Sequence, residues 1–142
     1  LALGCFWGPE IKFSKIEGVI KTEVGYCGGN SPTTTYKEVC TGKTNHAEVV
    51  KIDFDEKIVT YEKILKIFFQ IHDPTTLNSQ GPDFGTQYRS EIFYLNDNQR
   101  VVAERVLRDV DERMSGKVVT KISFLKNYCP AEEYHQKYLE KR

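Results

Sequence analysis

The chain has 142 residues, of which 39% are hydrophobic and 28% are charged, so its length and composition suit one globular domain. Twenty basic and twenty acidic residues give a formal net charge of zero, which predicts no affinity for nucleic acid or for a membrane surface. No apolar run approaches the roughly 20 residues of a membrane span. We therefore expect a single domain over residues 1–142, present as a monomer.

Strands and helices alternate in the first half of the chain. The pattern predicts a strand at 1–4, a helix at 7–16, a strand at 19–26, a strand at 48–54 and a helix at 61–71. The chain starts without methionine inside the first of these strands, so we expect the N-terminus of a longer polypeptide to have been trimmed.

The second half begins with a polar stretch at 74–86, a long connection of the kind that often carries function. A strand is predicted at 89–95, followed by a helix that Asp97 caps and that runs to about Met114, before Gly116. A last strand at 118–124 and a short polar helix from Pro130 complete the pattern. This order predicts an α+β fold, a two-layer sandwich in which helices pack on a mixed sheet.

The run Gly4-Cys5-Phe6-Trp7-Gly8-Pro9-Glu10 is the most informative segment. A strand that ends in glycine and opens into a helix would place Cys5 at the helix N-terminus, where free N–H groups and the helix dipole favour a thiolate. Phe6 and Trp7 would then form an apolar slot beside a nucleophile. The alternative interpretation is a buried structural cysteine in a strand–helix turn.

The cluster Thr44-Asn45-His46-Ala47-Glu48 lies where a loop becomes a strand. A glutamate held against apolar side chains has a raised pKa and stays a general acid near neutrality, which makes Glu48 a candidate acid. The alternative is an exposed carboxylate at a strand edge.

Two tyrosines and an aspartate lie in or beside the predicted loops. Tyr36 and Tyr88 could donate hydrogen bonds to a developing negative oxygen without ionising. Taken singly, each is also explained by packing, and Asp83 is also explained as a turn residue.

These segments together resemble the A-type peptide methionine sulfoxide reductases. The resemblance covers nearly the full chain, and its strongest pieces are residues 4–8, 42–50, 81–89 and 130–136. It implies a ferredoxin-like core and an enzyme that reduces the S epimer of methionine sulfoxide, free and within proteins, in the repair of oxidative damage. Asn45 departs from the family, which more often has glycine there, but asparagine tolerates a left-handed backbone.

The resemblance also implies a role for each candidate residue. Cys5 would attack the sulfoxide sulfur and become a sulfenic acid, while Glu48 would protonate the sulfoxide oxygen. The remaining roles are a methyl slot formed by Phe6 and Trp7, hydrogen bonds to the oxygen from Tyr36 and Tyr88, and substrate positioning by Asp83.

The cysteines leave open how the sulfenic acid is reduced. No cysteine follows Cys129, which is the first internal candidate, and Cys27 beside a glycine pair is the second. Cys40 looks like a packed small hydrophobic residue. The other route is direct attack on Cys5 by thioredoxin, glutaredoxin or a small thiol, with no bound cofactor.

The spacing of the cysteines bears on metal binding and on cellular compartment. No C-x-x-C pair is present, and His46, His72 and His135 show no ligand spacing with the cysteines, so we expect no metal site. The low cysteine density favours a cytoplasmic protein with reduced thiols over a secreted disulfide scaffold.

Two rival functions remain. A cysteine hydrolase would use Cys5 with His46 or His135 as its base, although no residue that would orient either histidine is evident from spacing. A binding module would recognise oxidised methionine without turnover.

Overall fold

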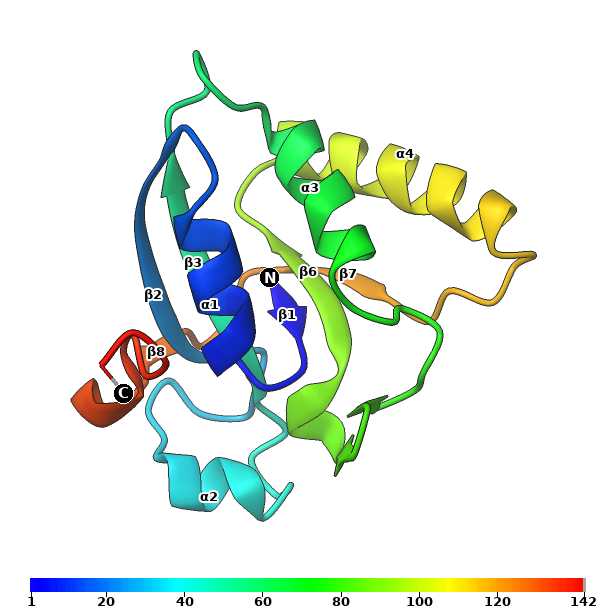
Figure 1. The fold of residues 1–142 in the computed structure, drawn as a ribbon. Helices are drawn as coiled ribbons and strands as arrows, with labels where there is room; N and C mark the ends of the chain where they lie inside the picture. The colour runs from blue at the N-terminus through cyan, green and yellow to red at the C-terminus, as the bar shows by residue number, and fades with distance from the viewer. Residues whose placement is uncertain (142) are drawn as a thin grey trace.

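Strands and helices alternate from the N-terminus in the computed structural model, which describes residues 1–141 (Figure 1). The first half contains β1 (Ala2–Leu3), α1 (Trp7–Ser14), β2 (Val19–Cys27), α2 (Tyr36–Cys40), β3 (Ala47–Phe54) and α3 (Tyr61–Gln70). The predicted elements of this half are all present, with slightly shifted ends. The helix α2 was not predicted, although Thr35 and Glu38 form the Thr-x-x-Glu signature of a helix start, and the Thr35 hydroxyl accepts the Glu38 backbone N–H.

In the second half, short elements precede and follow the strand β6 and the long helix α4. These are β4 (Ser79–Gln80), β5 (Asp83–Phe84), the 3₁₀ helix η1 (Thr86–Tyr88), β6 (Ser90–Tyr94), α4 (Asp97–Arg113), β7 (Lys121–Phe124), β8 (Cys129–Pro130) and the 3₁₀ helix η2 (Glu133–His135). The polar stretch predicted as a loop therefore folds into a two-stranded hairpin and η1. None of the helices in residues 1–141 is long and apolar enough to cross a membrane.

The strands form two three-stranded sheets that meet at the first residue. In one sheet β6 lies between β1, to which it is antiparallel, and β7, to which it is parallel. In the other, β2 is antiparallel to both β3 and β8. Leu1 exchanges two backbone hydrogen bonds with Val50, of 3.0 and 2.9 Å, so the two sheets continue into each other. The predicted α+β class is confirmed, the expected single sheet is divided, and the ferredoxin-like arrangement stays a prediction.

The helices pack on these sheets through apolar faces. Figure 1 shows α1 in front of β2 and β3, and α3 beside α4, which packs on β6 and β7. Four residues of α3 at helical spacing are buried in the main core: Ile64, Leu65, Phe68 and Phe69. The same core holds Phe6, at the start of α1, against Tyr26 of β2 and Val50 of β3. The core thus fixes the start of α1 over the second sheet.

Two predicted boundaries are wrong. The helix cap is Asn96 and not Asp97, because the Asn96 side chain accepts the Gln99 N–H at 2.9 Å. The segment from Pro130 does not begin as a helix, because Cys129 and Pro130 pair with Tyr26 and Gly25 as β8. Tertiary pairing of that segment outweighs its local helical pattern.

Candidate active site

Cys5 lies in a tight turn between β1 and α1, as the sequence predicts. The turn needs glycine at position 4, where φ is +96° and an added Cβ would lie 2.8 Å from the Gln80 side chain. Phe6 is the N-cap of α1, so Cys5 directly precedes the helix and remains partly exposed. The thiol is therefore accessible at the N-terminal end of a helix.

The prediction of a thiolate at Cys5 is wrong for the protein without substrate. Burial raises the pKa of Cys5 to about 11, although a hydrogen bond from the backbone of Trp7 acts in the opposite direction. Ionised Glu48 and Asp83 would each raise this pKa further, so both carboxyl groups lie within electrostatic range of the thiol. Desolvation and neighbouring acids outweigh the helix end, and Cys5 is a thiol at neutral pH.

Glu48 is buried beside the same turn. Side chains alternate along β3, so Glu48 shares a face with Val50, and its strand partner is Tyr26. The carboxyl Oε1 accepts the backbone N–H of Phe6 at 3.3 Å. Glu48 is 1% exposed, which rules out the alternative of an exposed strand-edge carboxylate. Within the part of the chain that the structure describes, its Oε2 has no hydrogen-bond partner.

The burial of Glu48 makes it an acid near neutral pH. Desolvation raises its pKa to about 8, the Phe6 N–H partly opposes this, and the charge of Asp83 adds to it. At pH 7 the neutral form therefore dominates. A proton on Oε2 would be held by a carboxyl group whose other oxygen is already engaged.

The two tyrosines reach this region from different elements. Tyr36 begins α2 and Tyr88 ends η1, and both side chains are partly buried. Burial raises the pKa of Tyr88 to about 12, and the charges of Glu48, Cys40, Asp83 and Cys5 act in the same direction. Tyr88 therefore lies within electrostatic range of both the thiol and the acid.

Tyr36 and Asp83 complete the set predicted from the sequence. Burial raises the pKa of Tyr36, followed by a hydrogen bond with Cys40 and the charge of Glu48. Asp83 starts β5, is partly buried, and acts on the pKa of both Cys5 and Glu48. The structure thus gathers the predicted residues from four separate stretches of the chain.

Phe6 and Trp7 lie in an aromatic cluster with His135, a contact that the sequence analysis did not predict. The His135 ring lies 5.2 Å from the Phe6 ring and 5.7 Å from the Trp7 ring, centre to centre. It also lies 4.5 Å from the ring of Tyr36. His135 is 1% exposed, so its ring is packed inside this aromatic cluster against Phe6 and Trp7. The run 130–136 carried the family resemblance, but its spacing did not indicate this contact.

Glu132 connects two of the elements that surround the aromatic cluster. Its Oε1 accepts the hydroxyl hydrogen of Tyr26 at 2.7 Å, and its Oε2 accepts the backbone N–H of Tyr36 at 2.9 Å. One carboxylate therefore anchors the start of α2 to β2 and to the C-terminal segment.

The other cysteines occupy different environments. Cys27 is fully buried and its thiol donates to the Lys126 carbonyl at 3.2 Å, while Cys129 is partly buried in β8. The expectation that Cys40 is a packed hydrophobic residue is wrong, because it is exposed at the C-terminus of α2. Burial raises the pKa of Cys40, a hydrogen bond with Tyr36 acts in the opposite direction, and the charge of Glu48 raises the pKa further.

The histidines give no support to a hydrolase. His46 Nε2 contacts the Ser31 carbonyl at 2.9 Å, and His135 Nδ1 accepts the Trp7 indole N–H at 3.0 Å. Over residues 1–141, the remaining nitrogen of each ring is buried without a partner, so neither histidine hydrogen-bonds to Cys5. Asn45 has φ of +59°, as its place in the turn before β3 predicts.

The described part of the chain shows no candidate metal site. Residues 1–141 contain no cluster of three or more histidine, cysteine, aspartate or glutamate side chains that could hold an ion. The described residues bring together the Cys5 thiol, the neutral buried carboxyl group of Glu48 and a cluster of aromatic rings. An α+β domain with this arrangement is a candidate for a thiol-dependent enzyme.

Comparison with known proteins identifies the family. A family model described as peptide methionine sulfoxide reductase matches residues 1–142. The chain is 78% identical to the peptide methionine sulfoxide reductase MsrA of Pelagibacter ubique, over all of this chain and 97% of that protein. The chain belongs to the peptide methionine sulfoxide reductase family and is an oxidoreductase that reduces methionine sulfoxide.

Solved structures agree with this assignment. Mxr1 from Saccharomyces cerevisiae in reduced form has a TM-score of 0.94 at 41% identity, over 100% of this chain and 83% of that one. An unusual oxidised form of Mxr1 has a TM-score of 0.77 at 37% identity, over 100% and 79% of the two chains. Mxr1 in complex with Trx2 has a TM-score of 0.69 at 26% identity, over 97% and 81%.

We expect the burial of Glu48 to reduce stability as pH rises. Its folded pKa is raised to about 8, so the neutral form folds without penalty below about pH 4.5, and stability is lost as pH rises through 8. Glu48→Gln removes this titration. Urea unfolding should show the stability of the variant relative to wild type growing by about 3 kcal/mol between pH 5 and pH 8. A difference that does not change with pH would contradict the raised pKa.

Proposed function

We propose that Cys5 attacks the sulfur of methionine S-sulfoxide, free or within proteins, while Glu48 protonates the departing oxygen. The observation that carries this proposal is a neutral, buried Glu48 whose Oε2 is unpartnered among the described residues, within electrostatic range of the Cys5 thiol. Sulfoxide oxygen leaves poorly until it is protonated, so an acid that stays neutral at pH 7 meets the main chemical need.

The protonation states suggest an order of proton transfers. Cys5 and Glu48 both carry protons in the free enzyme at pH 7, because their pKa values are about 11 and about 8. Glu48 gives its proton to the sulfoxide oxygen, and the carboxylate that results accepts the thiol proton as the Cys5 sulfur attacks. The attack forms a bond between Cys5 Sγ and the substrate sulfur, and the S–O bond breaks as the protonated oxygen leaves as water. A water molecule then adds to Cys5 Sγ, the bond between the two sulfurs breaks to release the methyl thioether, and the proton lost returns to Glu48, which leaves Cys5 as a sulfenic acid.

The aromatic slot supports recognition of the substrate's methyl group. Trp7 is partly exposed, so its indole would supply apolar surface next to the thiol, while Phe6 is buried in the core at the start of α1. The hydroxyl groups of Tyr36 and Tyr88 would donate to the sulfoxide oxygen, because burial keeps both phenols protonated. Asp83, on the hairpin, would position the rest of the substrate.

We propose that an external thiol returns Cys5 to its reduced state. One thiol condenses with the sulfenic acid and releases water, and a second thiol then reduces the mixed disulfide. Full burial of Cys27 argues against rapid internal exchange there. Thioredoxin is the favoured donor, since the yeast relative forms a complex with Trx2; glutaredoxin or a small thiol is the alternative. The product methionine makes this a repair reaction for oxidative damage.

The first test separates the substrate epimers. With dithiothreitol as reductant, we expect turnover of the S epimer of a blocked methionine sulfoxide and none of the R epimer, as the family resemblance implies. Such a preference requires a pocket in which the methyl group, the oxygen and the peptide chain each have one place. Chiral chromatography of the product mixture measures both rates. Equal turnover of the two epimers would contradict the proposed pocket.

Glu48→Gln tests the acid directly. We expect kcat/KM to fall by about 10²–10⁴-fold, the usual range for loss of a general acid, while alkylation of Cys5 by iodoacetamide continues. The wild-type kcat/KM should also fall above about pH 8, where Glu48 loses its proton. Cys5→Ser should abolish turnover in the same assay. Normal turnover by Glu48→Gln would mean that the proton comes from another group.

The route of reduction is tested by removing the remaining thiols. The triple variant Cys27→Ser, Cys40→Ser, Cys129→Ser should keep wild-type turnover with both dithiothreitol and thioredoxin, because the external thiol attacks Cys5 itself. Turnover that persists with dithiothreitol but is lost with thioredoxin would contradict this and assign an internal resolving cysteine. The single variants, Cys129→Ser and Cys27→Ser among them, would then identify it.

A further inference from the structure

The C-terminal segment that follows β8 holds the indole of Trp7. Its Nε1–H donates to His135 Nδ1 at 3.0 Å, and the ring of Tyr138 stacks on it at 3.8 Å between centres and 13° between planes. The hydrogen bond joins residues 128 positions apart in the sequence. The orientation of this wall of the slot is therefore set by the end of the chain as well as by α1.

The hydrogen bond also defines the state of His135. An indole N–H is only a donor, so Nδ1 must be the acceptor and the neutral ring carries its proton on Nε2. Burial lowers the pKa of His135, which favours the neutral ring at pH 7, although the charge of Glu132 acts in the opposite direction. His135 can thus hold Trp7 in one orientation.

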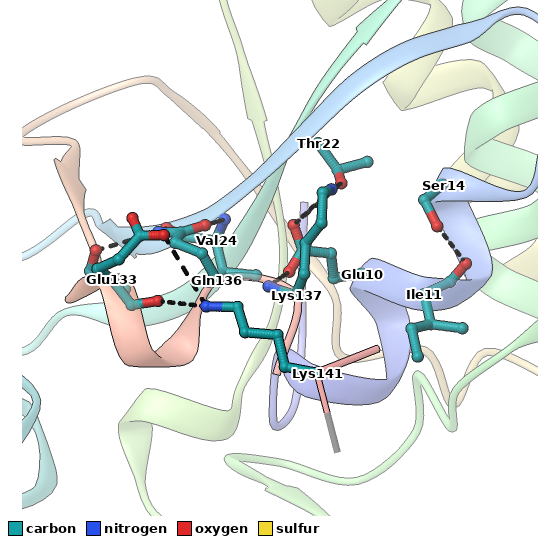
Figure 2. Close-up of polar contacts among 10 residues, drawn as sticks. Glu10, Ile11, Ser14, Thr22, Val24, Glu133, Gln136, Lys137 and Lys141 are labelled. Atoms are coloured by element: carbon teal, nitrogen blue, oxygen red, sulfur yellow. Dashed lines mark hydrogen bonds and ion pairs between the residues drawn. The ribbon is translucent and has the colours of Figure 1, made fainter. Parts of the chain in front are cut away.

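A buried carboxylate fastens this segment to the body of the protein (Figure 2). Glu10 of α1 is 1% exposed, and its Oε1 accepts the backbone N–H of Lys137 at 2.7 Å. Its Oε2 accepts the Thr22 hydroxyl at 2.9 Å and lies 3.8 Å from Lys137 Nζ, which also donates to Thr22. Glu10 therefore joins α1, β2 and the C-terminal segment at one point.

Gln136 makes a second attachment beside it, also visible in Figure 2. Its Oε1 accepts the Val24 N–H at 2.9 Å, and its Nε2 donates to the Val24 carbonyl at 2.8 Å and to the Ala131 carbonyl at 3.0 Å. The amide thus satisfies the edge of β2 as another strand residue would. We call Glu10, Gln136 and Lys137 the clasp.

Two residues of the clasp, Gln136 and Lys137, lie in the sequence between His135 and Tyr138, the residues that contact Trp7. Lys137 has φ of +50°, a left-handed conformation that is unfavourable for a non-glycine residue and needs support from its surroundings. The bond from its N–H to Glu10 supplies that support. This turn redirects the chain after His135 so that Tyr138 reaches the indole.

We propose that Glu10 is a positioning residue that, through Lys137, holds His135 and Tyr138 against Trp7 and so sets the width of the methyl slot. One Glu10 oxygen accepts the Lys137 N–H and the other accepts the Thr22 hydroxyl, so Glu10 would act without touching the substrate. The inference rests on the proposed function, in which Trp7 lines the slot. A width set in this way makes Glu10 a determinant of selectivity for methyl over larger alkyl sulfoxides.

Glu10→Ala tests the proposal, because Trp7 is the single tryptophan of the chain and its fluorescence reports this site alone. We expect a red-shifted emission and stronger quenching by acrylamide. The ratio of kcat/KM for a methyl sulfoxide over the ethyl homologue should fall by about tenfold, which is the scale of discrimination of one methylene. The change should appear in KM for the methyl substrate, with kcat within about threefold of wild type.

Two variants serve as controls. Glu10→Gln keeps a carbonyl oxygen for the Lys137 N–H and should retain the emission and selectivity of wild type. Glu133→Ala removes an exposed carboxylate of the same segment, 3.8 Å from Lys141 Nζ, and should change neither property. A purely structural role for Glu10 would lower the unfolding temperature of Glu10→Ala without altering the methyl-to-ethyl ratio of the folded protein.

The outcomes separate the two proposals. Wild-type emission and wild-type selectivity in folded Glu10→Ala would overturn the role of the clasp. If Glu10→Ala does not fold, Gln136→Ala removes the second attachment and should show the same two changes; wild-type behaviour there overturns the proposal equally. Absence of sulfoxide turnover in the wild type would overturn the proposed function, while the fluorescence comparison would still decide whether the clasp positions Trp7.

Discussion

The hydrogen bond from the Phe6 backbone N–H to Glu48 Oε1 links the start of α1 to β3, and the site is arranged around it. An N–H at a helix start has no partner within the helix, and a buried carboxyl group needs one, so each satisfies the other. The same contact places the acid one residue from Cys5. Because the bond engages only one oxygen, burial leaves the other to carry a proton near neutral pH. The hydrogen bond that satisfies the Phe6 N–H thus also places Glu48 where the proposed reaction needs an acid.

Cys5 and Glu48 are both protonated at pH 7, so the proposed reaction would start only when substrate is present. A thiol with a pKa of about 11 is a weak nucleophile at pH 7, and an acid with a pKa of about 8 is still neutral there. Transfer of the Glu48 proton to a sulfoxide leaves a carboxylate beside the thiol, which then becomes the base that Cys5 lacks in the free enzyme. Burial therefore keeps Cys5 as a thiol until the base is formed, and it keeps Glu48 protonated as the acid.

The aromatic cluster around Trp7 depends on contacts between distant parts of the chain. His135 packs on Phe6, Trp7 and Tyr36, while Glu132 holds the start of α2 to β2. These contacts follow from the pairing of β8 with β2, which brings the C-terminal segment back over α1. The clasp then completes the attachment. The two sheets and α1 form the frame, and rings from the C-terminal segment pack on Phe6 and Trp7.

Sequence analysis alone predicted the class of fold, the family and the order of the main elements, because apolar periodicity and the segments around Cys5, Glu48 and Asp83 are local signals. The roles that it assigned to the site residues stay predictions. It also predicted a raised pKa for Glu48. It did not predict the thiol state of Cys5, because desolvation depends on which side chains surround the sulfur, and local helix signals gave the opposite sign. Nor could it assign the contacts of His135 with Phe6 and Trp7, the exposure of Cys40, the strand β8 or the attachment made by Glu10. These depend on contacts between residues up to 128 positions apart, and only the folded chain decides which polar groups find partners and which remain buried without one.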